Sequence, residues 1–262
     1  MRTYAVIIPV YNEAALFPRM LARLEATPPV APPDDEGRMG PPLKRLIVVV
    51  DDGSTDGTRA LVEAQRGREG VAVVLHERNR GKGAAVRSGL AEALRLGADV
   101  VLIHDADLEY DPRDHGKLLA PILDGRADAV LGSRFLGETH RVLYFWHSVA
   151  NHFITLCSNM LTNLNLTDIE CCLKAMRREV AERLDLREER FGVEPEIVAK
   201  LSRIRLRREE GDGGGWRPLR VYEVPVSYAG RTYEEGKKIT WRDGVSALRC
   251  IVKYALGAGE IR

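Results

Sequence analysis

The sequence lacks an excess of charge of one sign. It has 262 residues, with 39 basic and 38 acidic side chains and a formal net charge of +1. Nucleic-acid-binding proteins usually carry a clear basic excess, because phosphate contacts supply most of the affinity. We therefore expect no nucleic acid as the main partner. The chain is long enough to bury a sizeable core, as one α/β domain would.

Cysteines and long apolar runs are also scarce. The four cysteines form no disulfide framework, and the adjacent pair Cys171 and Cys172 lacks zinc-site spacing, which favours buried thiols in a reducing compartment. The first residues show no secretory signal, and no segment reaches the ~18 continuous apolar residues needed to span a bilayer. We expect a cytoplasmic protein, in contact with at most the cytoplasmic face of a membrane.

The pattern of apolar residues alternates between short strands and helices. Turns close each apolar run, and helical periodicity follows most of them. This alternation predicts an α/β fold with a mainly parallel sheet, whose ligands gather beyond the carboxyl ends of the strands. The predicted strands cover residues 4–10, 46–50, 71–75, 99–103, 127–131 and 219–226, and the main predicted helices cover 56–65, 81–96 and 241–256.

Two further segments differ from this alternation. Residues 28–42 hold six prolines and no periodicity, so we expect an exposed loop. Residues 142–166 form an amphipathic stretch rich in aromatic side chains. We favour a helix packed on the sheet over a helix on a membrane surface, since aromatic stripes are usually core.

Carboxylates follow two of the predicted strands. Asp105 and Asp107 lie one residue apart after strand 99–103, and Glu109 is placed to add a third oxygen. Hard cations such as Mg²⁺ prefer oxygen ligands and bind through one or two carboxylates plus substrate phosphates. Asp51 and Asp52 end another strand and face the same crevice. Together the clusters suggest a nucleotide diphosphate, whereas each alone is also typical of a solvated turn or a helix cap.

Gly81, Lys82 and Gly83 open a helix in a way that partly resembles a dinucleotide-binding loop. The third glycine of that fingerprint is absent, and the turn after the first strand has no glycine, so a nicotinamide-dependent dehydrogenase is not expected. Lys82 at the helix N-terminus is a candidate for contact with phosphate or ribose. A solvated lysine is the alternative.

Five segments in this order resemble the inverting family 2 of glycosyltransferases, which has the nucleotide-sugar-binding A-type fold. They are IPVYNE, VVDDGSTDGT, NRGKGAAVRSG, DADLEYDP and GSRF. In the second half, NLTDIECCLKAMRREV, FGVEPEIVAKL and VYEVPVSYAGRTYEEGKKITWRDG resemble the branch that includes dolichyl-phosphate mannose synthase and polyprenyl-phosphate glucosyltransferases. The resemblance implies one domain over residues 1–262, with a nucleotide-sugar-binding half (1–137) and an acceptor-binding half (138–262).

The resemblance also implies roles for individual residues. The donor nucleotide sugar would contact Pro9, Tyr11, Glu13, Asp51, Asp52, Lys82, Asp105 and Ala106. Mg²⁺ or Mn²⁺ would bind Asp105, Asp107 and Glu109, and phosphates would bind Arg134, Lys174, Arg231, Lys237 and Lys238. Asp107, Arg134 and Arg231 would act in catalysis. Glu109 departs from the glutamine and Lys174 from the arginine that relatives usually carry.

These residues imply transfer of a hexose, mannose or glucose, from a GDP- or UDP-sugar to a polyprenyl phosphate at a membrane surface. A lipid phosphate is largely dianionic at neutral pH and needs no general base. One alternative is a family 2 enzyme that acts on a hydroxyl of a glycan or glycolipid, with Asp168 or Glu170 as base. However, the Q-x-x-R-W segment typical of those enzymes is absent. A non-catalytic nucleotide- or lipid-binding subunit is the second alternative, and no oligomeric state is predicted.

Overall fold

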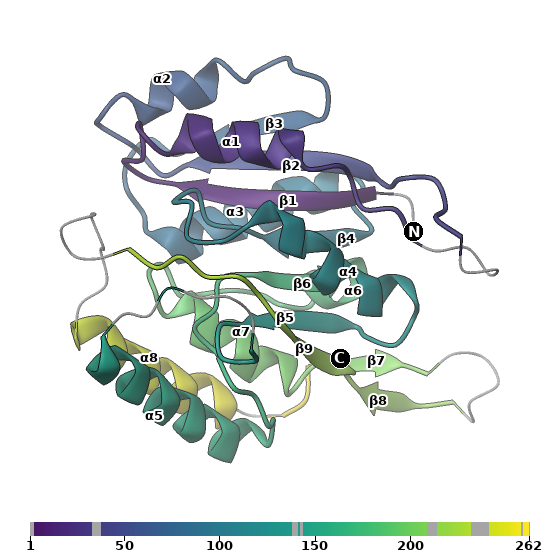
Figure 1. Cartoon of the computed structure of the whole chain (residues 1–262). Coiled ribbons are helices and arrows are strands. Elements are labelled where there is room, and N and C mark those ends of the chain that lie inside the picture. The colour runs from purple at the N-terminus through teal and green to yellow at the C-terminus, as the bar shows by residue number, and fades with distance from the viewer. Residues whose placement is uncertain are drawn as a thin grey trace.

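The computed structural model describes residues 3–32, 38–137, 141, 144–208, 214–231, 241–257 and 259–261, without the side chains of 241–243. Within these ranges, seven strands form one sheet in the order β3-β2-β1-β4-β6-β5-β9 (Figure 1). The strands are β1 (Thr3–Val10), β2 (Lys44–Asp51), β3 (Val71–Leu75), β4 (Val100–Ile103), β5 (Ala129–Ser133), β6 (Lys174–Arg177) and β9 (Val221–Pro225). The six predicted strands are confirmed, with ends that shift by at most two residues.

The sheet is mainly parallel, as predicted, with one reversed strand. β1 pairs in parallel with β2 and β4, whereas β6 lies antiparallel between β4 and β5. Ile103 at the end of β4 pairs with Lys174 at the start of β6. The residues before β6 therefore lie at the same edge of the sheet as those after β4. β6 is not among the six strands that the sequence predicted.

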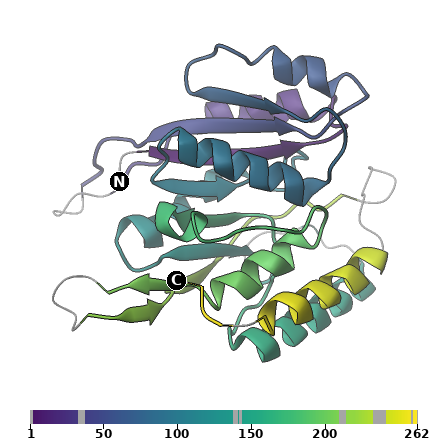
Figure 2. The same ribbon diagram turned by 180° about the vertical axis from the view of Figure 1, so that it is seen from behind.

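Helices cover both faces of the sheet. α1 (Phe17–Ala26) and α4 (His115–Leu123) lie on one face, and α3 (Lys82–Arg95) and α7 (Val193–Leu201) lie on the other (Figures 1 and 2). The shorter elements are α2 (Thr58–Glu63), η1 (Pro112–Asp114) and α6 (Arg178–Ala181), and β7 (Arg205–Arg207) pairs with β8 (Trp216–Pro218) in a second sheet.

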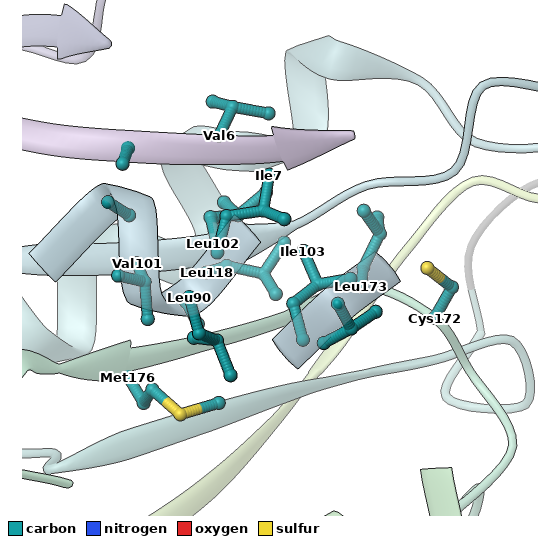
Figure 3. Packing of buried hydrophobic residues seen from close by; sticks show 14 of the residues in the cluster. Val6, Ile7, Leu90, Val101, Leu102, Ile103, Leu118, Cys172, Leu173 and Met176 are labelled. Atoms are coloured by element: carbon teal, nitrogen blue, oxygen red, sulfur yellow. The ribbon is translucent and has the colours of Figure 1, made fainter. Parts of the chain in front are cut away.

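Branched apolar side chains fill the space between sheet and helices. Ile7, Leu102 and Leu118 are fully buried among their neighbours from β4, α3, α4 and β6 (Figure 3). Gly89 allows α3 to approach β1 closely, because a Cβ atom there would lie 2.3 Å from Cγ2 of Ile7. This packing holds the N-terminus of α3 at the end of the sheet where the carboxylates gather.

Two helices lie side by side beyond the last strands, at one end of the molecule (Figures 1 and 2): α5 (Phe145–Thr162) and α8 (Trp241–Ala255). α5 lies within the amphipathic segment, but the expectation that its aromatic residues form core is wrong. Phe145, Trp146 and Phe153 are largely exposed, because α5 packs mainly on α8 and α7 and not on the sheet.

The remaining sequence expectations concern cysteines, the proline-rich segment and membrane spans. Cys171, Cys172 and Cys250 are buried free thiols, as predicted, and Cys157 is half-buried. The described parts of segment 28–42 lie mostly on the surface. Across the ranges that the structure describes, no helix combines the length and apolar character needed to cross a membrane.

Candidate active site

One cavity of about 1000 Å³ opens at the carboxyl ends of β1 and β4. Its wall combines both halves of the chain. From residues 1–137 it includes Pro9, Tyr11, Glu13, Asp52, Lys82, Asp105, Ala106, Asp107, Glu109 and Arg134, and from residues 138–262 Glu170, Glu194, Tyr228 and Arg231. Most of the residues that the sequence singled out therefore share one cavity.

Asp52 holds the loop that precedes α3. Its carboxylate accepts hydrogen bonds from the backbone N–H groups of Arg80 (3.0 Å) and Gly81 (2.7 Å), and from Nδ1 of His76 (2.7 Å). Gly81 has a φ of 96°, which favours glycine, and a Cβ atom there would meet the carbonyl oxygen of Glu189. Asp52 thus shapes the cavity floor. The buried Asp51 does not line the cavity and accepts from the backbone N–H of Ser54.

Lys82 connects two carboxylates in the cavity wall. Its Nζ lies 2.8 Å from Oδ2 of Asp105 and 2.7 Å from Oε1 of Glu194. Burial disfavours the charged amine, but Asp105 and Glu194 outweigh this effect and raise the pKa of Lys82 well above its usual value. Burial also opposes ionisation of Asp105, yet Lys82 lowers the pKa of that carboxyl. Lys82 is therefore charged, and is not a solvated surface lysine.

Arg231 lies among three further carboxylates. Its Nη2 is 2.8 Å from Oδ2 of Asp107, and its other nitrogens lie 3.3 Å from Glu13 and 3.4 Å from Glu109. Burial, together with the charges of Asp105 and Glu109, still raises the pKa of Asp107 to about 7. Burial and the neighbouring carboxylates together therefore outweigh the effect of Arg231 on Asp107.

Asp105 and Asp107 fit the donor chemistry of a divalent cation. The raised pKa of Asp107 shows that its carboxylate gains from additional positive charge. Glu109 is already used by the chain, since its oxygens accept from Oη of Tyr228 (3.0 Å) and the backbone N–H of Arg231 (2.9 Å). No cluster of three or more His, Cys, Asp or Glu side chains suited to a metal occurs in the described ranges. Such an ion would need substrate phosphates as further ligands, as Mg²⁺ commonly does.

A buried ion pair orients Arg134 in the cavity wall. Nε and Nη2 of Arg134 lie 2.6 Å and 2.8 Å from the two oxygens of Asp168, and the guanidinium lies 5.1 Å from the ring centre of Tyr228. Burial opposes ionisation of Asp168, but Arg134 lowers the pKa of that carboxyl. Asp168 itself does not line the cavity. It positions Arg134, a role that the sequence did not reveal.

Comparison with known proteins identifies the family. The profile described as "Glycosyl transferase family 2" matches residues 5–185. The chain belongs to glycosyl transferase family 2. Polyprenol monophosphomannose synthase of Mycolicibacterium smegmatis is 35% identical over 185 residues, which are 69% of this chain and 64% of that protein. Undecaprenyl-phosphate mannosyltransferase of Micrococcus luteus is 27% identical over 242 residues, which are 88% of this chain and 85% of that protein.

A solved structure shares the fold of this glycosyltransferase. Glucosyl-3-phosphoglycerate synthase of Mycobacterium tuberculosis, crystallised with Mn²⁺, UDP and phosphoglyceric acid, has a TM-score of 0.65 at 19% identity, over 97% of this chain and 79% of that one. The likeness confirms the A-type glycosyltransferase fold.

Of the predicted phosphate contacts, Lys174 does not line the cavity, and two others lie outside the described residues. Lys174 is buried in the glycosyltransferase core, where its Nζ donates to the carbonyl oxygens of Ile169 and Cys171. Lys237 and Lys238 lie outside the described residues. The roles of all three stay predictions.

Two acidic residues of this family 2 enzyme gain importance from the structure. Glu170 lines the cavity, and its burial and the nearby Glu194 raise the pKa of its carboxyl to about 7. Each of the two carboxylates has one buried oxygen without a hydrogen-bond donor among the described residues. Glu194 was not predicted as a site residue, although its segment FGVEPEIVAKL was part of the resemblance. Its place in the site follows only from the approach of α7 to Lys82.

Proposed function

We propose that this family 2 glycosyltransferase moves a hexose, mannose or glucose, from a GDP- or UDP-sugar to a polyprenyl phosphate, with inversion at the anomeric carbon. The observation that carries the proposal is the presence of two cationic guanidinium groups, Arg134 and Arg231, in one cavity with Asp105 and Asp107. Relatives named for transfer to polyprenol or undecaprenyl phosphate support the choice of acceptor.

The two arginines account for an anionic acceptor. Arg134 is aligned by Asp168 in a bidentate pair, and Arg231 is held by the carboxylates around it. Guanidinium groups held in this way bind phosphate oxygens in a defined direction, which places the nucleophile against the sugar. The acceptor phosphate oxygen forms the new bond to the anomeric carbon. The bond from that carbon to the diphosphate breaks, and its electron pair leaves with the nucleotide.

The donor diphosphate belongs near the acidic turn after β4. Asp105 and Asp107 are the residues that would hold Mg²⁺ or Mn²⁺ there, and Lys82 adds a fixed positive charge beside Asp105. The bound ion would offset the charge that develops on the leaving diphosphate. The nucleoside then lies toward Pro9, Tyr11 and Asp52, which line the adjoining wall.

One specific observation favours a second candidate, transfer to a hydroxyl group. A general base works best with a pKa near the working pH, and Glu170 lines the cavity with a pKa of about 7. Glu170→Gln separates the two candidates, because a phosphate acceptor needs no base. Asp168→Asn does not separate them, since it also disturbs Arg134.

The test is a matrix of donors and acceptors. GDP-mannose, UDP-glucose and related labelled nucleotide sugars are each combined with a polyprenyl phosphate or the matching free polyprenol, with Mg²⁺, with Mn²⁺ and with chelator. We expect transfer to the phosphate alone, lost in chelator. Transfer to the free alcohol at an equal rate, together with loss of activity in Glu170→Gln, would establish the hydroxyl candidate instead.

A further inference from the structure

The helix α5 presents an apolar stripe to solvent. Its residues contain no Asp, Glu, Lys or Arg. The exposed fractions are 74% for Trp146, 56% for Phe153 and 75% for Met160, and Val149 and Leu156 are also exposed. These positions recur at intervals of three and four residues, so they share one side of the helix. This side of α5 faces away from the protein.

The neighbouring helix α8 repeats the pattern and adds positive charge. Val245, Val252 and Leu256, just past its last turn, are exposed by 58%, 51% and 66%. Arg249 lies between them in the sequence and is also exposed. Residues 244–255 contain no acidic side chain. We call the exposed side chains Trp146, Val149, Phe153, Leu156, Met160, Val245, Val252 and Leu256 the α5–α8 face.

The same helices also form part of the cavity wall. Phe145 and Ile154 of α5 and Ala247 of α8 line the cavity that contains Asp105 and Asp107. The helices that carry the α5–α8 face thus also form part of the cavity wall, and Phe145, which is 71% exposed, lies next to Trp146 of that face. A lipid acceptor whose phosphate enters this cavity has an apolar chain that needs an apolar surface close by.

We propose that the α5–α8 face docks on a lipid bilayer with anionic headgroups, an inference that rests on the proposed transfer to a polyprenyl phosphate. Exposed Trp, Phe, Leu and Met side chains on an uncharged helix side are typical of helices that lie in a membrane interface. Arg249 then faces anionic headgroups, whereas Lys253 is already paired with Glu188 at 2.8 Å. The polyprenyl chain stays in the bilayer while its phosphate reaches Arg134 and Arg231.

A second copy of the chain fits this surface less well. In a two-fold symmetric dimer the same patch meets itself, so Arg249 would be brought against another apolar and basic surface. α5 contributes no acidic side chain to neutralise it, and neither do residues 244–255. A charge buried at an interface without a partner is costly. Anionic lipid supplies the missing negative charge.

The test is flotation of the purified chain with vesicles of phosphatidylglycerol or of phosphatidylcholine. We expect binding to the anionic vesicles and weaker binding to the neutral ones. The combined variant Trp146→Ser, Phe153→Ser, Met160→Ser is expected to bind at least about tenfold less, because each substitution removes apolar contact. Met39→Ser is the matched control, since Met39 is as exposed as Met160 at 75% but lies outside the α5–α8 face.

Transfer assays separate this inference from the proposed function. With a short, water-soluble polyprenyl phosphate and no vesicles, the combined variant should match the unaltered chain; with a long-chain acceptor in vesicles it should lose most of its rate. Failure of the unaltered chain on both acceptors refutes the proposed function, while flotation still tests docking. Docking is refuted if the combined variant floats with vesicles as well as the unaltered chain does. It is also refuted if sedimentation equilibrium shows that the unaltered chain is a dimer and that the combined variant is a monomer, because the α5–α8 face would then be a dimer interface.

Discussion

Replacement of Asp168 by asparagine tests how Arg134 is held in the cavity wall. The two carboxylate oxygens accept from Nε (2.6 Å), Nη2 (2.8 Å) and the backbone N–H (3.1 Å) of Arg134, from the backbone N–H of Glu170 (3.1 Å) and from Nδ2 of Asn151 (3.3 Å). Asparagine offers one oxygen and one NH₂ group to the same donors. Some of these donors would then face another donor, and Arg134 would lose its counter-charge.

The magnitude follows from burial. Removal of one partner from a buried ion pair costs about 3–5 kcal/mol, and Asp168 is fully buried while the Arg134 side chain is 16% exposed to the cavity. Because water in the cavity partly solvates Arg134, we expect a loss of about 3 kcal/mol in the free energy of unfolding. Urea denaturation followed by circular dichroism measures this value. The control Asp185→Asn, in a pair exposed by 69% on each side, should cost less than about 1 kcal/mol.

The pH dependence has a definite sign. The folded-state pKa of Asp168 lies below its usual value of about 3.9, so the ionised form stabilises the fold. This stabilisation is complete above about pH 4 and is lost as the pH falls through the folded-state pKa. The difference in unfolding free energy between the unaltered chain and Asp168→Asn should therefore shrink in acid, and it should also fall somewhat between pH 5 and pH 8, because the charge of Asp168 contributes to the raised pKa of Glu170, about 7.

The same variant, Asp168→Asn, should slow transfer because it weakens binding of the acceptor. Misaligned Arg134 should raise KM for the polyprenyl phosphate about tenfold or more, with a smaller effect on KM for the donor. A variant with unfolding free energy within about 0.5 kcal/mol of the unaltered chain, and with unchanged KM, would refute this account of Asp168.

Three further substitutions test other parts of the structure. Asp107→Asn should lower metal-dependent transfer at least about a hundredfold without loss of helix signal in circular dichroism. Glu170→Gln should leave transfer to a phosphate acceptor near normal. It should also stabilise the protein by roughly 1–3 kcal/mol at pH 8, because a carboxyl whose folded-state pKa is raised to about 7 costs stability as the pH rises from about 4.5 to 7. Gly89→Ala should cost about 1–3 kcal/mol, measured by thermal unfolding, since its Cβ atom would overlap Ile7.

Two of these substitutions, Asp107→Asn and Gly89→Ala, have a matched comparison. Asp124→Asn changes an exposed carboxylate far from the cavity lining and should leave transfer unchanged. Gly116→Ala also lies in a helix, but a Cβ atom there meets nothing within 4 Å, so it should not destabilise the protein. Equal effects of Gly89→Ala and Gly116→Ala would contradict the close approach of α3 to β1. Normal transfer in Asp107→Asn would exclude that carboxylate from metal binding.

The sequence predicted best those strands whose pattern of apolar residues is local. β1 to β5 are short runs of branched apolar residues closed by turns, and each run carries its own information about strand formation. The sequence did not predict the reversed direction of β6, since direction depends on which strands flank it. Nor did it predict that α5 exposes its aromatic stripe, because a period of 3.6 residues marks a face but not what covers it.

By itself, the sequence determined the order of the first five strands and the polar residues at the strand ends, because both depend on residues close together along the chain. Only the tertiary structure decided which of those residues act together. Lys82 meets Glu194, Arg134 is held by Asp168, and Arg231 lies among Glu13, Asp107 and Glu109. These partners are separated by 34 to 218 positions. Packing of α3, β6 and α7 around one sheet edge brings them within hydrogen-bond distance, and no local pattern encodes that approach.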